Sequence, residues 1–197
     1  MTSTVHMPRR ISRTPRFEYW DDAAADVLRR LAPVKAACFT DISTPLENTV
    51  VAVGRAIDYA HDSFNSSDSE LDSLAGLESA ASLAMYSLGL EMDPTFGIPS
   101  ELSAIKNRVA LHALLVDRQA KYGPTNITRF GLLGILIRVT DKAERLKNLI
   151  STGVVTSDES VVDTLSDVIG YYVVATMFCR GDFGLPLKTQ PQPKEAK

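Results

Sequence analysis

The chain is poor in the residues that build disulfide frameworks and zinc sites. Its 197 residues contain only two cysteines and three histidines. No CxxC pair occurs, and His6, His61 and His112 lie far apart in the sequence, so a zinc site is not expected. Cys38 and Cys179 both lie in apolar contexts, which is typical of buried, reduced thiols in an intracellular protein.

Long apolar runs are also missing. The longest nearly apolar stretch, residues 168–179, is too short to cross a bilayer. Residues 1–16 contain four arginines but no apolar core, so we do not expect them to act as a secretory signal. These absences predict a protein of the cytoplasm that does not enter a membrane.

The period-two alternation of half-buried strands is absent, and apolar residues recur instead with the 3.6-residue period of helices. Thr44 and Ser100 are candidate N-caps. The predicted fold class is all-α, a helical bundle with a four-helix-type core. The expected helices cover residues 18–32, 44–63, 69–90, 100–122, 131–150 and 159–180. The expected inner face of the fourth consists of Leu102, Ile105, Val109, Ala113 and Val116.

The ends of the chain differ in composition from its centre. Residues 1–17 are expected to form a disordered basic arm, and residues 181–197, with three prolines, a flexible Pro-rich tail. Between them we expect one compact domain with two regions. Residues 18–95 form an N-terminal helical region with no assigned role, and residues 99–180 carry the candidate site.

Charge is nearly balanced overall but segregated along the chain. The net charge of −3 offers no positive excess for binding duplex nucleic acid. Residues 41–95 contain ten acids and one base, whereas residues 103–150 contain nine bases and three acids. Residues 158–167 then add four acids and no base. A basic segment followed by an acidic one is typical of a site for an anion and a metal, and equally of two salt-bridged helices.

Three of those acids, Glu159, Asp163 and Asp167, are spaced four residues apart and share one side of the last helix. The same side continues into Gly170 and Val174, so the acidic stripe enters an apolar seam. Ionised carboxylates in such a seam must pair with cations or coordinate a metal, because uncompensated burial of charge is unfavourable.

The preceding helix presents a basic stripe, Arg138, Lys142 and Arg145, interrupted by Asp141. Alone, such a stripe is most often a solvated helix face. A short loop makes the two helices antiparallel neighbours, so the bases can face the acids. Either the two stripes form salt bridges, or the carboxylates hold Mg²⁺ while the bases hold phosphate oxygens. The spacing leaves both outcomes open.

Further donors lie upstream. Lys121 and Asn126 flank the Tyr122-Gly123-Pro124 turn, whose backbone N–H groups could face an anion. Taken alone, this turn is more commonly a simple helix stop.

Three ordered blocks of the chain match a pattern found in a phage-associated family. The matching positions are Lys121, Tyr122 and Gly123, then Arg138, Asp141, Lys142, Arg145 and Leu146, then Glu159, Ser160, Asp163, Thr164, Asp167 and Tyr171. Over roughly residues 99–180 the chain thereby resembles the nucleotide modification associated domain family. That family is similar to the all-α nucleoside triphosphate pyrophosphohydrolases of the MazG-like and dimeric dUTPase group.

The resemblance implies roles for particular residues. Related enzymes hold Mg²⁺ on acidic motifs of neighbouring helices and release a nucleoside monophosphate and pyrophosphate. The implied metal ligands, for Mg²⁺ or Mn²⁺, are Glu159, Asp163 and Asp167, and the implied catalytic carboxylates are Asp141, Asp163 and Asp167. The implied phosphate-binding residues are Lys121, Arg138, Lys142 and Arg145, and the implied base contacts are Tyr122, Asn126 and Tyr171. A homo-oligomer, dimer or tetramer, is also implied, as is the host cytoplasm if a phage encodes the chain.

Three functions compete. The first is a Mg²⁺-dependent nucleotide-processing enzyme, most simply a (deoxy)nucleoside triphosphate pyrophosphohydrolase. The second is a module that binds a nucleotide, or a nucleotide-derived signal, without turnover. It is favoured by Lys142 and Arg145, which interrupt the first acidic motif near Asp141 and Glu144. The third is a helical interaction protein whose charges form structural salt bridges.

Overall fold

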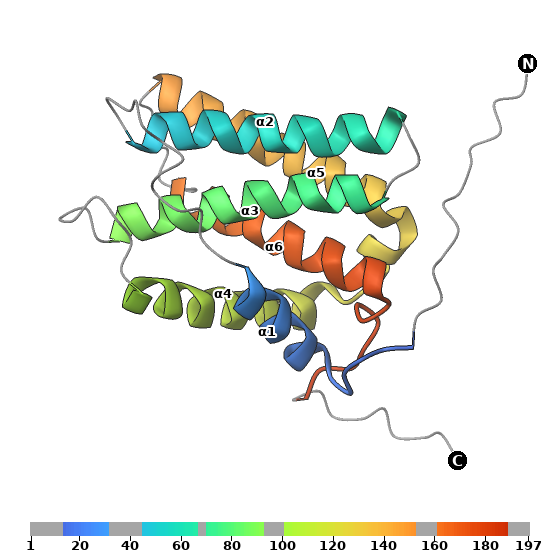
Figure 1. Cartoon of the computed structure of the whole chain (residues 1–197). Helices are drawn as coiled ribbons and strands as arrows, with labels where there is room; N and C mark the ends of the chain where they lie inside the picture. Colours follow the sequence, from blue (N-terminus) through green and yellow to red (C-terminus); the bar gives the residue numbers. More distant parts are fainter. Residues whose placement is uncertain (1–13, 32–44, 67–69, 93–100, 153–160, 189–197) are drawn as a thin grey trace, which may run out of the picture.

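The computed structural model describes residues 14–31, 45–66, 70–92, 101–152 and 161–188. Within these ranges the chain forms six α-helices and no strand, which confirms the predicted all-α class (Figure 1). The helices are α1 (Trp20–Arg30), α2 (Pro45–Ser66), α3 (Glu70–Met92), α4 (Glu101–Tyr122), α5 (Thr125–Thr152) and α6 (Val161–Arg180). The candidate caps Thr44 and Ser100 lie outside the described residues.

Four of these helices form the core of the bundle. Helix α2 packs on α3, α3 on α6, α6 on α5, and α5 on α2, so the four close into a ring. Helices α1 and α4 contact each other and lie on one side of this ring, next to α6 (Figure 1). The predicted four-helix-type core is therefore present, with two additional helices on one flank.

Helix α6 is apolar because other helices surround it. It contacts α1, α3, α4 and α5, and half of its residues are buried. By length and hydropathy alone α6 could span a membrane, yet 56% of its apolar stretch is buried inside the bundle. Neighbouring helices therefore cover much of the apolar surface of α6.

The predicted inner face of α4 was wrong. Ile105 and Val109 are 49% and 66% exposed, and Ala113 is also exposed. The buried residues of α4 are instead Ala104, Asn107, Leu111 and Leu115, Val116 is partly buried, and the side chain of Leu102 lies outside the described residues.

Polar contacts with α1 explain this rotation of α4. Arg108 donates from Nε to the carbonyl oxygen of Leu28 at 3.1 Å and from Nη2 to that of Leu31 at 2.8 Å. A ring nitrogen of His112 lies 2.9 Å from the carbonyl oxygen of Asp21. These bonds satisfy carbonyl groups of α1 and orient α4, so one of its two apolar stripes faces outward.

Helix α5 starts earlier than predicted and is broken at Gly131. The backbone of Gly131 has φ +60° and ψ −149°, a conformation that essentially only glycine adopts without strain. A Cβ atom there would lie 3.3 Å from Cζ of Phe178. The break separates the first turns of α5 from the remainder and leaves Ile127 buried beside α4 and α6.

The predicted flexible ends are partly ordered. Phe183 and Leu187, expected in the tail, are buried, and the Trp20 amide donates to the carbonyl oxygen of Pro186 at 2.9 Å. The amide of Arg16 donates to Asp182 at 3.1 Å. Residues 181–188 therefore pack against the start of α1, because the burial of their apolar side chains there is favourable.

Candidate functional site

The acidic stripe is divided between solvent and a partly buried position. Asp163 and Asp141 are exposed, on α6 and α5 respectively, and Glu159 lies outside the described residues. Asp167 sits one turn beyond Asp163, and its side chain is only 13% exposed. Of the predicted carboxylates that the structure describes, only Asp167 enters the apolar seam.

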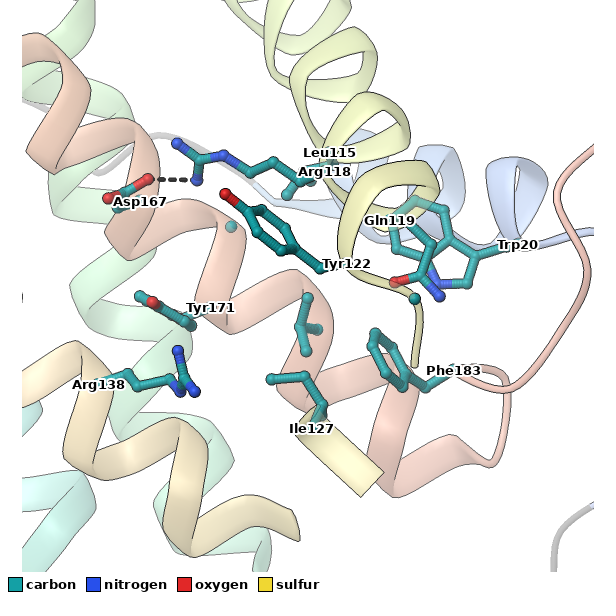
Figure 2. Close-up of a pocket in the computed structure, with 13 residues that line it drawn as sticks. Trp20, Leu115, Arg118, Gln119, Tyr122, Ile127, Arg138, Asp167, Tyr171 and Phe183 are labelled. Carbon is teal, nitrogen blue, oxygen red and sulfur yellow. Dashed lines mark hydrogen bonds and ion pairs between the residues drawn. The ribbon is translucent and has the colours of Figure 1, made fainter. Parts of the chain in front are cut away.

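Both oxygens of Asp167 are engaged by cations. Oδ1 accepts a hydrogen bond from Nη1 of Arg118 on α4, and Oδ2 lies 2.8 Å from Nζ of Lys142 on α5 (Figure 2). The pairing of Lys142 with the acidic stripe is one of the two outcomes left open by the spacing. Arg118 was missed by the sequence reasoning, although it lies seven residues after Leu111 on the buried side of α4.

The described carboxylates do not assemble a metal site. Across the part of the chain that the structure describes, no three His, Cys, Asp or Glu side chains gather in a way that could hold a metal ion. Asp167 already has a cation on each oxygen, and Asp141 and Asp163 are exposed. These residues do not fit Mg²⁺ by themselves, so we derive no metal-dependent step from them.

Of the other predicted phosphate ligands, Lys121 is a solvated surface residue. Its Nζ lies 2.8 Å from Oδ2 of Asp117 one turn earlier, and this hydrogen bond raises the pKa of Lys121. Arg145 is half-buried on α5 but does not line the cavity described next. The side chain of Asn126 lies outside the described residues.

A cavity of about 400 Å³ lies between α1, α4, α5 and α6. This volume falls in the range of small-molecule sites, roughly 300–1,000 Å³. Figure 2 shows Asp167 and Tyr171 along α6, Arg138 on α5, and Arg118 and Tyr122 on α4. The walls are completed by Trp20, Leu115, Gln119, Gly123, Ile127, Gly170, Val174 and Phe183.

The polar part of the cavity carries more positive than negative charge. Among the described residues, Arg118 and Arg138 line it together with a single carboxylate, Asp167. Arg138 is exposed, and among the described residues its side chain has no hydrogen-bond or ion-pair partner. Its guanidinium therefore offers a full set of donors to an incoming anion.

Four aromatic rings contribute the apolar part. Trp20 and Phe183 are almost completely buried and meet edge to face, with ring centroids 6.4 Å apart. Tyr171 is half-buried, and Tyr122 is 71% exposed. Nε1 of Trp20 has no hydrogen-bond partner among the described residues, although it is buried. The rings thus extend from a buried floor to an exposed rim.

Gly170 lies in the cavity wall where α6 passes α4. A Cβ atom on Gly170 would lie 3.0 Å from Cδ2 of Leu115. The absence of a side chain at this buried helical position lets Leu115 pack closely against α6. The sequence reasoning missed six of the lining residues: Trp20, Leu115, Arg118, Gln119, Ile127 and Phe183. The chain contains a single tryptophan, and that rarity was the one signal available for Trp20.

Compared with protein-family models, curated proteins and solved structures, the chain matches none. The resemblance to the nucleotide modification associated domain family therefore stays a prediction.

Proposed function

We propose that this protein binds a small molecule that joins a planar aromatic ring to an anionic group, and that it holds this ligand without hydrolysing it. Nucleotides are a biological class with this chemistry. The observation that carries the proposal is the cavity itself, where the described lining residues combine two arginines with four aromatic rings.

The charged side of the cavity suits an oxyanion. The guanidinium group of arginine matches phosphate and carboxylate oxygens with paired hydrogen bonds. Arg138 brings an unpartnered guanidinium, and Arg118 has further N–H groups besides the one that it donates to Asp167. Partial enclosure by protein strengthens this attraction relative to open water.

The aromatic side of the cavity suits a flat ring. Trp20 and Phe183 form a buried apolar floor, while Tyr122 and Tyr171 stand nearer the opening. Aromatic side chains bind planar groups by stacking and by edge-to-face contact, with little entropy lost per side chain. A nucleobase is a ring of this type.

Binding without turnover is supported by the state of the carboxylates. Asp167, the one carboxylate among the described residues that line the cavity, already forms ion pairs with Arg118 and Lys142. A cation beside each oxygen competes with a proton or a metal ion for that carboxylate. The Mg²⁺-dependent pyrophosphohydrolase, which would also use Glu159, stays a prediction. The following experiment tests it as well.

The test is calorimetric titration of the full chain with nucleoside mono-, di- and triphosphates of each base, with and without Mg²⁺. Products are followed by chromatography. We expect saturable binding of at least one nucleotide, a higher thermal stability in its presence, and no product. Arg138→Gln should weaken binding. Arg55→Gln removes an equal charge from α2 at a residue that is not among those lining the cavity, so it should not weaken binding.

Two results would count against the proposal. If no nucleotide raises the thermal stability or gives a calorimetric heat of binding, the result would favour a helical interaction protein with structural salt bridges. Release of pyrophosphate that depends on Mg²⁺ would instead establish the hydrolase.

A further inference from the structure

We infer that the cavity selects a ligand with a single phosphate group, such as a nucleoside monophosphate, and that Asp167 determines this selectivity. The inference rests on the proposed function, because it specifies the ligand of the same cavity. It depends on the balance of charge around Asp167 and on how its carboxylate is held.

The charged side chains in and beside the cavity can be counted. Arg118 and Arg138 line the cavity, and Lys142 is held next to it by its ion pair with Asp167. Three cations and one carboxylate give a local charge of +2. A phosphate monoester carries about −1.5 to −2 at neutral pH, so one phosphate group neutralises the site.

A triphosphate fits this arrangement poorly. Its larger negative charge exceeds what the local cations offset, and proteins usually bind triphosphates together with Mg²⁺ held on one or two carboxylates. In the described part of the chain, Asp167 is the only carboxylate that lines this cavity, and both of its oxygens are committed to cations. The cavity of about 400 Å³ also favours a ligand near the small end of the usual range.

Asp167 has two effects on the ligand. It cancels one positive charge, which limits how much negative charge the site can neutralise. It also holds Arg118 and Lys142 in place before a ligand arrives, which reduces the entropy lost on binding. Asp167 is therefore a specificity-determining residue, and it need not touch the ligand.

The experiment compares one base with different numbers of phosphates. The full chain is titrated with adenosine, AMP, ADP and ATP, and with the guanosine, cytidine and uridine series, in Mg²⁺-free buffer and then with Mg²⁺. For the wild-type chain we expect the monophosphate of the preferred base to bind more tightly than its di- and triphosphate, with no effect of Mg²⁺.

The isosteric variant Asp167→Asn raises the local charge from +2 to +3. It should shift the affinity ratio of diphosphate to monophosphate by about tenfold toward the diphosphate, a change equal to about 1.4 kcal/mol. Arg55→Gln serves as a control and should leave the ratio unchanged. Arg138→Gln, an exposed position where misfolding is not expected, should weaken the monophosphate about tenfold and leave the uncharged nucleoside unaffected.

The outcomes separate the two proposals. Tighter binding of a triphosphate than of the monophosphate, or an Arg138→Gln effect equal on nucleoside and monophosphate, would overturn the inference but leave the nucleotide-binding function intact. An Asp167→Asn protein that folds and keeps the wild-type ratio would do the same. No binding in any series would overturn the proposed function, and the inference with it.

Discussion

The first prediction concerns the stability cost of adding one methyl group at Gly131. The substitution Gly131→Ala places a Cβ atom on a residue with φ +60° and ψ −149°. Holding a non-glycine residue in this region costs about 1–3 kcal/mol. The new Cβ would also lie 3.3 Å from Cζ of Phe178, so that ring must move by a few tenths of an ångström. We expect a loss of about 2 kcal/mol in the free energy of unfolding.

For a chain of this length, a loss of 1 kcal/mol lowers the melting temperature by about 2–4 °C, so Gly131→Ala should melt about 4–8 °C below wild type. The assay is thermal unfolding followed by far-ultraviolet circular dichroism, supported by urea denaturation. The variant should also bind the ligand of the cavity less well, because the break at Gly131 places Ile127 in the cavity wall.

Gly54→Ala is the matched control. Gly54 is buried within α2, and a Cβ atom there would lie 2.9 Å from Cε and 3.6 Å from Nζ of Lys147, the end of a flexible side chain that can shift. Alanine is favoured over glycine in a helix by up to about 1 kcal/mol, so this variant should be as stable as wild type or more stable. A Gly131→Ala protein that matches Gly54→Ala in melting temperature would refute the reasoning.

Two further predictions concern the cavity and acid stability. Gly170→Val adds a side chain to the cavity wall, with a Cβ atom that would lie 3.0 Å from Cδ2 of Leu115, and calorimetry should show at least a tenfold loss of affinity for any ligand. Burial alone would raise the pKa of Asp26, but hydrogen bonds from Arg30 and Arg29 outweigh it and lower the pKa below 3.8. A lowered folded-state pKa stabilises the fold above the unfolded-state value, and this contribution is lost as pH falls through the folded value. Asp26→Asn should therefore be less stable than wild type in urea at pH 7, and the gap should shrink below about pH 4.

Local pattern was sufficient for much of the fold. The 3.6-residue period predicted the six helices. The four-residue spacing of Glu159, Asp163 and Asp167 predicted an acidic stripe that enters an apolar seam, and of its described members Asp167 does so. The short connection after α5 predicted that its bases face that stripe, and Lys142 does contact Asp167. These features depend on residue spacing along one helix or on the length of the connection between adjacent helices. Both can be read directly from the sequence.

Helix α4 shows where pattern reasoning failed. Its sequence contains two apolar stripes, and periodicity cannot choose between them. The bonds from Arg108 and His112 to carbonyl groups of α1 select the stripe with Leu111 and Leu115. Ile105 and Val109 are therefore exposed, although their spacing predicted burial. Such contacts join residues about 80 positions apart in the sequence, as between Arg108 and Leu28.

The cavity likewise depends on contacts between residues that are far apart in the sequence. The sequence by itself determined the six helices and the charged stripes that contain Arg138, Lys142 and Asp167, but not the buried face of α4. Only the tertiary structure decided that Arg118 neutralises Asp167 across 49 residues, and that Trp20 meets Phe183 from the opposite end of the chain. The physical reason is that helical periodicity is a property of neighbouring residues, whereas a binding site depends on which faces of distant helices pack together.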